Sequence, residues 1–441
     1  MASITCNKCF SSNYMLLNPG EAGFLDLFKI LFSSDIGNRK FVDCPDDRVH
    51  EPLFWRRWII FVSVLVQKML KAMAKPMSGF GSGVEHWLNL LSGNGGFSGL
   101  MLNSLKGKVV HPDRTSENFL SFTGCIDTRL ELDTSIRHED CRYYAALTVM
   151  AAKASYENHR YIQSIVNNNW KWISWDPMIS GTVRSKFPEV AVTHLADPNH
   201  PSGHGSKSRT KSKLLDPNLE FIIPSRNNYQ EKATTQAFIL QDKKDVIIVS
   251  FRGTETFDAD AWSSDFDISW YEIPGAGKIH GGFLKALGLQ KSQGWPQEQS
   301  DDKPETAYYA IRNLLRVRLQ NNDRSKFIVT GHSLGGALAV LFPAVLSLHE
   351  ESWLLDRLQG IYTFGQPRVG DEKFKEYMER IMEKHCINYY RFVYSYDMVP
   401  RLPYDDSTLM FKHFGTCIYY NSFYQGKVSD NGEFAILVVV V

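Results

Sequence analysis

The stretch IVTGHSLGGALAV, from Ile328 to Val340, joins a predicted strand to a predicted helix and raises the first question about function. A β-rich run ends at Thr330 and a helical run begins at Gly335, so Ser333 falls on the turn between them. A serine on a strand-to-helix turn is held in a strained, accessible conformation, which is the geometry of a nucleophile elbow. Gly331 and Gly335 fit this interpretation, because bulkier side chains would collide across so tight a turn. The alternative is a glycine-rich turn without chemical consequence.

Around this stretch, short β-rich runs alternate with helical runs from Ala237 onward. Strands that alternate with helices predict a mostly parallel sheet covered on both faces, so the predicted fold class is α/β. The runs are, in order, AFIL, DVIIVSF, ETAYYAIRNLLRVRL, KFIVT, GGALAVLFPAVLSLHE, GIYTF, EKFKEYMERIMEKH and YYRFVYS.

A nucleophilic serine needs a base and an acid that orients the base, in the chain order Ser, Asp, His for this kind of fold. Asp397, in YYRFVYSYDMVPRLP, follows a predicted strand at the sheet edge where open α/β sheets place their sites. The competing Asp371 directly precedes a predicted helix and is better interpreted as its N-cap. We therefore predict Asp397 as the acid.

The tetrahedral intermediate of acyl transfer also needs hydrogen-bond donors for its oxyanion. The backbone N–H of Leu334, at the start of the predicted helix, is one candidate. Thr254, in VIIVSFRGTETFDADAW, follows an earlier strand and is the second. An ordinary turn at the end of a strand is the alternative for this segment.

Five blocks together resemble the class 3 (fungal-type) triacylglycerol lipases: FRGTETFDADAW, IHGGFLKAL, VTGHSLGGALA, YTFGQPRVGD and YSYDMVPRLP. The upstream FWRRW and YQEKATTQAFIL resemble the plant oil-body lipase branch of that family. The resemblance implies an α/β-hydrolase fold and hydrolysis of acylglycerols through an acyl-enzyme. It also implies Ser333 as nucleophile, Asp397 as acid and Thr254 with the Leu334 amide as oxyanion hole. A lid is implied over residues 256–268.

The triad base is the part of the pattern that this sequence does not match. Of 13 histidines only His413 follows Asp397. In the lipases that this chain resembles, the base comes from a segment beyond the position that matches His413. We therefore expect the C-terminus to be truncated and the triad histidine to be missing. His413 remains as an alternative base, since chain order permits it. His280 precedes both partners and is better interpreted as support for the oxyanion loop, and the side chain of His332 is expected to face away from the serine hydroxyl. A catalytically impaired isoform that binds lipid surfaces is the alternative function, and an acyltransferase or small-ester hydrolase is a third.

The most apolar segment, PLFWRRWIIFVSVLVQKMLKAMAKP at 52–76, is basic at its ends and rich in aromatic residues. Its apolar run is shorter than the roughly 20 residues of a transmembrane helix. These features favour an element that lies in a lipid surface, with a buried core helix as the alternative. The following segment, 84–108, is interrupted by glycines and predicts two short amphipathic helices. No signal peptide is evident, so we expect the protein to start in the cytosol. The resemblance to oil-body lipases then implies a lipid-droplet or endoplasmic reticulum membrane surface, on its cytosolic side.

Composition narrows the remaining classes of partner. A net charge of +1 gives no reason to expect nucleic acid, and seven scattered cysteines fit a reducing compartment. No metal or organic cofactor is called for, and CNKC at 6–9 stands without the further ligands of a zinc site. The oligomeric state is left open. The predicted organisation is a poorly ordered 1–50, a lipid-surface region 51–110, a helical extension 111–236 with a polar loop at 197–217, a lipase core 237–425 and an atypical tail 426–441.

Overall fold

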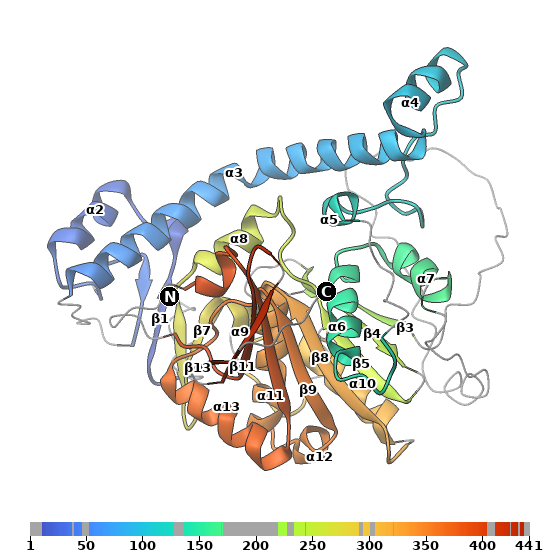
Figure 1. Ribbon diagram of the computed structural model, residues 1–441. Coiled ribbons are helices and arrows are strands. Elements are labelled where there is room, and N and C mark those ends of the chain that lie inside the picture. The colour runs from blue at the N-terminus through green and yellow to red at the C-terminus, as the bar shows by residue number, and fades with distance from the viewer. Residues whose placement is uncertain are drawn as a thin grey trace.

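A nine-stranded sheet forms the centre of the protein in the computed structural model (Figure 1). The strand order is β13-β12-β11-β10-β9-β8-β5-β4-β3, and the five strands from β11 to β5 are parallel. The strands are β3 Leu219–Arg226, β4 Ala233–Gln241, β5 Val246–Phe251, β8 Lys326–His332, β9 Leu358–Phe364, β10 Asn388–Tyr394, β11 Thr416–Tyr420, β12 Gly426–Asp430 and β13 Glu433–Ala435. The structure describes residues 11–37, 39–45, 53–127, 136–168, 170, 219–226, 233–242, 244–290, 294–299, 305–320, 322–403, 411–423, 425–430 and 433–435.

Helices cover both faces of this sheet. Successive side chains of a strand point to opposite faces, and in β5 Ile247 and Val249 belong to one core while Ile248 belongs to another. The first core is closed by α9 Gly281–Leu287, α10 Ala307–Gln320, α11 Leu334–Leu348, α12 Ser352–Leu355 and α13 Glu372–His385, and the second by α6 Tyr143–Ala154 and α7 His159–Asn168. The α/β-hydrolase fold expected from the sequence is confirmed, and the predicted strands and helices after Ala237 lie where expected.

The N-terminal region is better ordered than predicted. Residues 11–45 form β1 Tyr14–Leu17, η1 Pro19–Glu21, α2 Phe24–Phe32 and β2 Val42–Asp43. With β6 Trp270–Ile273 and β7 Gly277–His280 they build a second, four-stranded sheet of order β2-β1-β6-β7. Residues 11–37 and 39–45 thus contain defined elements where the sequence predicted poor order, because Tyr14, Leu27 and Phe41 bury their side chains against the rest of the protein.

One helix replaces the separate N-terminal elements that the sequence predicted. Helix α3, Phe54–Gly93, has 40 residues and spans about 60 Å. It continues through Pro76, and α4, Gly96–Leu105, begins only after Gly95, whose φ is +77°. In Figure 1, α3 crosses over α8, Ala259–Phe266, with α2 near one end and α4 at the other. Part of α3 is buried, since Ile60 and Val64 belong to the core that also holds Leu27.

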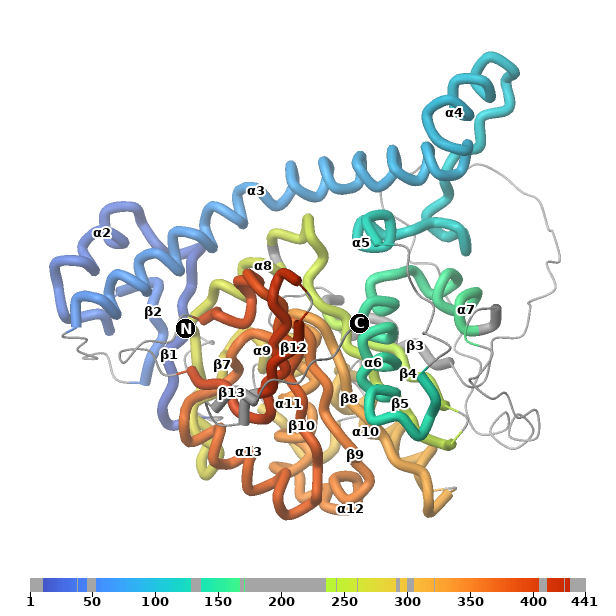
Figure 2. The backbone as a smooth tube through the Cα atoms, viewed as in Figure 1, coloured from blue at the N-terminus to red at the C-terminus, as the bar shows by residue number. Residues whose placement is uncertain are grey.

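Other boundaries also differ from the predicted ones. The single helix expected over 141–168 is divided into α6 and α7, and the central sheet extends beyond 237–425 through β3, β12 and β13. The short helices α5, Phe122–Ile126, and η3, Val399–Arg401, complete the described elements. The polar loop 197–217 and residues 436–441 lie outside the described residues. Within the described chain, no helix combines the length and apolarity that a membrane crossing needs. Figure 2 traces the same path as a backbone tube.

Candidate active site

Ser333 lies on the turn between the parallel strand β8 and helix α11. Its φ of 55° and ψ of −127° are unusual for a residue with a side chain, and such conformations persist where surrounding contacts enforce them. Its N–H donates to the Phe364 carbonyl at 2.9 Å, which fixes the turn to the end of β9. The side chain is only 5% exposed, and its hydroxyl makes no hydrogen bond with a described residue. This is the position expected for a nucleophile elbow.

Gly331 and Gly335 allow the chain to turn so sharply. A Cβ on Gly331 would lie 2.2 Å from the carbonyl carbon of Gly335, and one on Gly335 would lie 2.2 Å from the carbonyl oxygen of Phe251. Both contacts are with backbone atoms, so no side-chain rotation relieves them. The start of α11 is therefore packed directly against the end of β5.

Asp397 follows β10, two strands away from the elbow with β9 between them. Its Oδ1 accepts a hydrogen bond from the N–H of Val399 at 3.0 Å. A Cβ on Gly365, whose φ is +56°, would lie 2.6 Å from Asp397 Oδ2 and 3.4 Å from His332 Nε2. Gly365 thus leaves the space that the carboxylate occupies beside the elbow. Asp371 caps α13 by accepting from the N–H of Phe374 at 2.9 Å, which confirms the N-cap interpretation.

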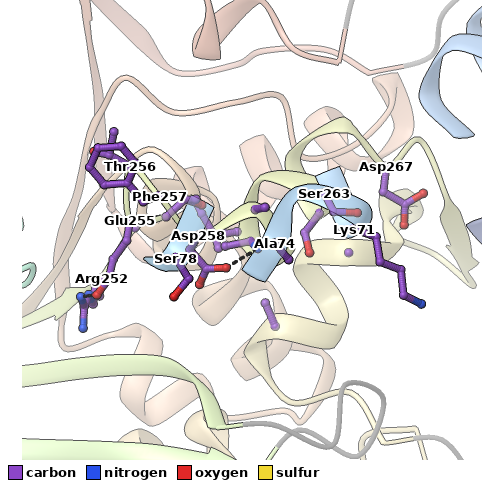
Figure 3. Close-up of a pocket in the computed structure, with 18 of the residues that line it drawn as sticks. Lys71, Ala74, Ser78, Arg252, Glu255, Thr256, Phe257, Asp258, Ser263 and Asp267 are labelled. Atoms are coloured by element: carbon purple, nitrogen blue, oxygen red, sulfur yellow. Dashed lines mark hydrogen bonds and ion pairs between the residues drawn. The ribbon is translucent and has the colours of Figure 1, made fainter. Parts of the chain in front are cut away.

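Thr254 and Leu334, the two predicted oxyanion donors, line the same cleft. The cleft has a volume of about 1310 Å³, and Figure 3 shows its lining from α3 and from the segment that follows β5. The N–H of Leu334 opens α11, where the first amides have no partner within the helix. Among the described residues that line the cleft, neither Ser333 nor Asp397 is present. The cleft therefore reaches the oxyanion side of the candidate site.

Helix α8, in the segment expected to form the lid, is bonded to Thr254. The Thr254 hydroxyl donates to Asp265 Oδ2 at 3.2 Å, and both side chains are buried. Burial raises the pKa of Asp265 to about 7, against the opposing effect of the Thr254 hydrogen bond, and the charge of Asp258 raises it further. Asp265 Oδ1 has no hydrogen-bond partner among the described residues. This carboxyl group is therefore held in surroundings that favour its neutral form.

We expect Asp265→Asn to remove a pH dependence of stability. Because the folded-state pKa is raised, the contribution of Asp265 is fully present below its unfolded value of about 4 and is lost as pH rises to about 7. Asparagine does not titrate and can still accept from Thr254. The free energy of unfolding, measured by urea titration between pH 5 and pH 7.5, should therefore fall more steeply in the parent protein than in the variant, by up to about 1.4 kcal/mol per pH unit. Parallel pH profiles would contradict the buried, neutral carboxyl.

None of the described histidines hydrogen-bonds Ser333. His413 Nε2 lies 2.6 Å from the Pro400 carbonyl, and burial lowers its pKa well below the usual value. His332 makes its hydrogen bond through Nδ1, to the Tyr156 hydroxyl at 2.8 Å, and its Nε2 lies near Gly365. Burial lowers its pKa as well, and the charge of Asp397 opposes this.

His280 connects the lid segment to α9. Its Nδ1 accepts from the N–H of Phe283 at 3.3 Å, so Nε2 carries the proton and donates to the Asp267 carbonyl. Burial lowers its pKa to about 4, which keeps the ring neutral. A neutral imidazole with both ring nitrogens hydrogen-bonded is suited to supporting the lid segment and the start of α9.

Three residues of the site were not predicted from the sequence. Tyr156, which belongs to the helical extension, contacts His332. A Cβ on Gly253 would lie 2.1 Å from the Tyr156 hydroxyl. Gly365 stands in the block YTFGQPRVGD, and its position after a predicted strand was the available signal. Asp265 is one of several acids in the lid segment, and nothing in the sequence distinguishes it from the others.

Comparison with known proteins identifies the family of this chain. The family model for lipase (class 3) matches residues 248–407, and the chain belongs to the class 3 lipase family. It is 36% identical to triacylglycerol lipase OBL1 of Arabidopsis thaliana, over 96% of this chain and 82% of that protein. It is 32% identical to triacylglycerol lipase OBL1 of Ricinus communis, over 95% of this chain and 81% of that protein. The resemblance to this family and its plant branch is thereby confirmed.

A solved structure also matches part of the chain. The lipase from Rhizopus microsporus var. chinensis is 28% identical, with a TM-score of 0.34, over 46% of this chain and 62% of that one.

Proposed function

We propose that this protein is a triacylglycerol lipase that cleaves acylglycerol esters through an acyl-enzyme on Ser333. The observation that carries the proposal is Ser333 at positive φ between a parallel strand and a helix start. Thr254 and the Leu334 amide lie together at the adjoining cleft as donors. The relatives named triacylglycerol lipase support the substrate class. They lend no support to the alternative of a lipid-surface protein without catalytic activity.

In the proposed reaction Ser333 Oγ attacks the ester carbonyl carbon while its proton passes to a general base, although none of the described histidines hydrogen-bonds Ser333. The carbonyl oxygen becomes an oxyanion that accepts hydrogen bonds from Leu334 and Thr254, each donor contributing about 3 to 4 kcal/mol. The oxyanion collapses, the diacylglycerol leaves with the transferred proton, and water then releases the fatty acid from Ser333. In this scheme Asp397 orients that base. The contact of His413 with the Pro400 carbonyl argues against His413 as that base.

Hydrolysis of emulsified triacylglycerol by the parent protein and three variants tests this proposal. Ser333→Ala should lower the rate to that measured without protein, and Asp397→Asn should lower it as well, because the base loses the group that orients it. His413→Gln keeps an N–H that can reach the Pro400 carbonyl, so the rate should be unchanged. Urea midpoints of all four proteins control for misfolding.

Two other outcomes would be informative. Loss of activity in His413→Gln, with stability retained, would make His413 the base. No hydrolysis by the parent protein would contradict the catalytic proposal and favour the lipid-surface alternative.

We further propose that the protein works on a lipid-droplet or endoplasmic reticulum membrane surface, from the cytosolic side, and that α3 lies on that surface. Seven of the eight exposed large apolar side chains of α3, all except Phe54, lie along one side of the helix, and we call these seven the outer stripe. They are Trp55, Trp58, Val62, Met69, Met73, Phe80 and Trp87. At about 100° per residue they fall within roughly 60° of one another around the helix axis. The buried positions Ile60, Val64 and Gln67 lie on the opposite side of the helix.

Charge and neighbouring helices support the same surface. Residues 54–108 contain seven lysines and arginines and a single acid, Glu85, which favours anionic lipid headgroups. Exposed apolar side chains continue into the helices near the two ends of α3, with Phe24 and Phe32 on α2 and Phe97 and Leu105 on α4. So much exposed apolar surface is typical of a binding face.

For the organisation of the chain we propose a lipid-surface region at 51–110, a helical extension at 111–236 and a catalytic core at 237–425. The contact between Tyr156 of the extension and His332 beside the nucleophile supports a role for the extension in holding the core.

A further inference from the structure

Helix α3 is attached to the lid segment near the C-terminal end of α8. The hydroxyl of Ser63 donates to the Phe266 carbonyl at 2.7 Å, across 203 residues of sequence. Gln67 Nε2 donates in turn to Ser63 Oγ at 3.1 Å. Ser63 and Gln67 are both buried. Phe266 is the last residue of α8, so this contact fixes the point at which the helix rejoins the core.

A second attachment lies near the N-terminal end of α8. Phe257, two residues before α8, packs on the backbone of Gly81, where a Cβ would lie 2.5 Å from the Cβ and Cγ of Phe257. Phe80 meets the Phe257 ring edge to face, with ring centroids 5.8 Å apart, and Phe122 does so at 4.9 Å. The lid segment is therefore held against α3 on both sides of α8.

Between the two attachments α3 passes along the cleft rather than resting on solid core. Lys71, Ala74 and Ser78 of α3 line the cleft together with Phe257 and Asp258 of the lid segment (Figure 3). In this stretch Pro76 lacks a backbone N–H and removes one helical hydrogen bond. The helix thus has a weak point between its two contacts with the lid segment.

One side chain belongs both to the outer stripe and to an attachment. Phe80 is 66% exposed and contacts Phe257. A lipid surface that takes up Phe80 therefore competes with its contact to Phe257, and Phe257 adds apolar surface once it is free. A ligand shifts a conformational equilibrium only if it binds the two states with different affinity. Here the ligand is the lipid surface, and Phe80 and Phe257 offer it more apolar area when the lid segment is released than when it is attached.

We propose that α3 is a strap that holds the lid closed, and that uptake of the outer stripe by a phospholipid-coated lipid surface releases the lid. The coupling to lipid rests on the proposed lipid-surface function, whereas the holding of the lid does not. The strap and the lid are far apart in sequence, so the coupling is a property of the folded chain.

Hydrogen–deuterium exchange of residues 256–268 tests the holding of the lid without lipid. Gly81→Ala places a methyl group against Phe257, whereas Gly79→Ala on the same helix meets nothing within 4 Å. Exchange should be about tenfold faster in Gly81→Ala, equal to about 1.4 kcal/mol of lost closure, and unchanged in Gly79→Ala. Ser63→Ala, which removes the bond to Phe266 without adding bulk, should also accelerate exchange. Equal exchange in the parent protein, Gly81→Ala and Ser63→Ala would overturn the strap.

Flotation and exchange with triolein droplets coated with phosphatidylcholine and phosphatidylserine then test the coupling. We expect the parent protein to float with the droplets and its residues 256–268 to exchange faster when bound. Binding without faster exchange would overturn the coupling and leave the lipid-surface function standing. Failure to float would reject the lipid-surface function and the coupling together, and the lipid-free comparison would still decide whether α3 holds the lid.

Discussion

Replacing Met69, Met73 and Trp87 with glutamine is expected to weaken binding to lipid droplets by on the order of a hundredfold. These outer-stripe side chains are 49–56% exposed, so each has about half of its apolar surface left to bury. Half of the burial energy of a large apolar side chain is about 1 kcal/mol, and three such losses give about 3 kcal/mol. Glutamine preserves helix propensity, so α3 itself should persist.

The measurement is flotation with coated triolein droplets over a range of lipid concentrations. A matched control carries glutamine at Ala72, His86 and Ser92, which are exposed on α3 outside the stripe. The control should bind as the parent protein does. Equal weakening in both variants would show that charge or helix stability, and not the stripe, determines binding.

Gly335→Ala is expected to destabilise the protein by about 3 kcal/mol or more and to lower ester hydrolysis at least about a hundredfold. The added methyl group would lie 2.2 Å from the Phe251 carbonyl oxygen, so the start of α11 must move away from β5. That movement displaces the Leu334 amide from the end of β5. Thr254 comes three residues after β5 in the chain, so the two oxyanion donors are moved apart. A displacement of about 1 Å is enough for a loss of this size.

Urea unfolding and triacylglycerol hydrolysis measure the two effects. Gly83→Ala is the control, since a Cβ there meets nothing within 4 Å and alanine raises helix propensity. An unchanged midpoint for Gly335→Ala would contradict the close packing at the elbow.

Much of the core and part of the site were predictable because their signals are local. The alternation of strands and helices after Ala237 identified the parallel sheet, and the turn around Ser333 identified the elbow. Asp371 was assigned as an N-cap from the helix that follows it. Each of these predictions depends on residues within one or two turns of the chain, where backbone preferences act directly.

Predictions were less accurate where local signals were ambiguous. Glycines and Pro76 suggested breaks in a segment that forms the continuous α3, because burial of one side of the helix outweighs the cost of Pro76. The poor order expected at the N-terminus overlooked the pairing of β1 with β6, whose partner residues lie more than 200 positions along the chain. A short apolar segment cannot reveal such a distant partner.

Local patterns in the chain were enough to predict the α/β class, the position of Ser333 on its turn and the membership of Asp397 and Thr254 in strand-end loops. The tertiary structure decided which of these loops meet and what holds them. It placed Gly365 beside Asp397, Tyr156 on His332 across 176 residues, and Ser63 on the lid segment across 203. The physical reason is that a turn forms from the preferences of adjacent residues, whereas contacts between distant segments form only when the burial of the whole core brings those segments together.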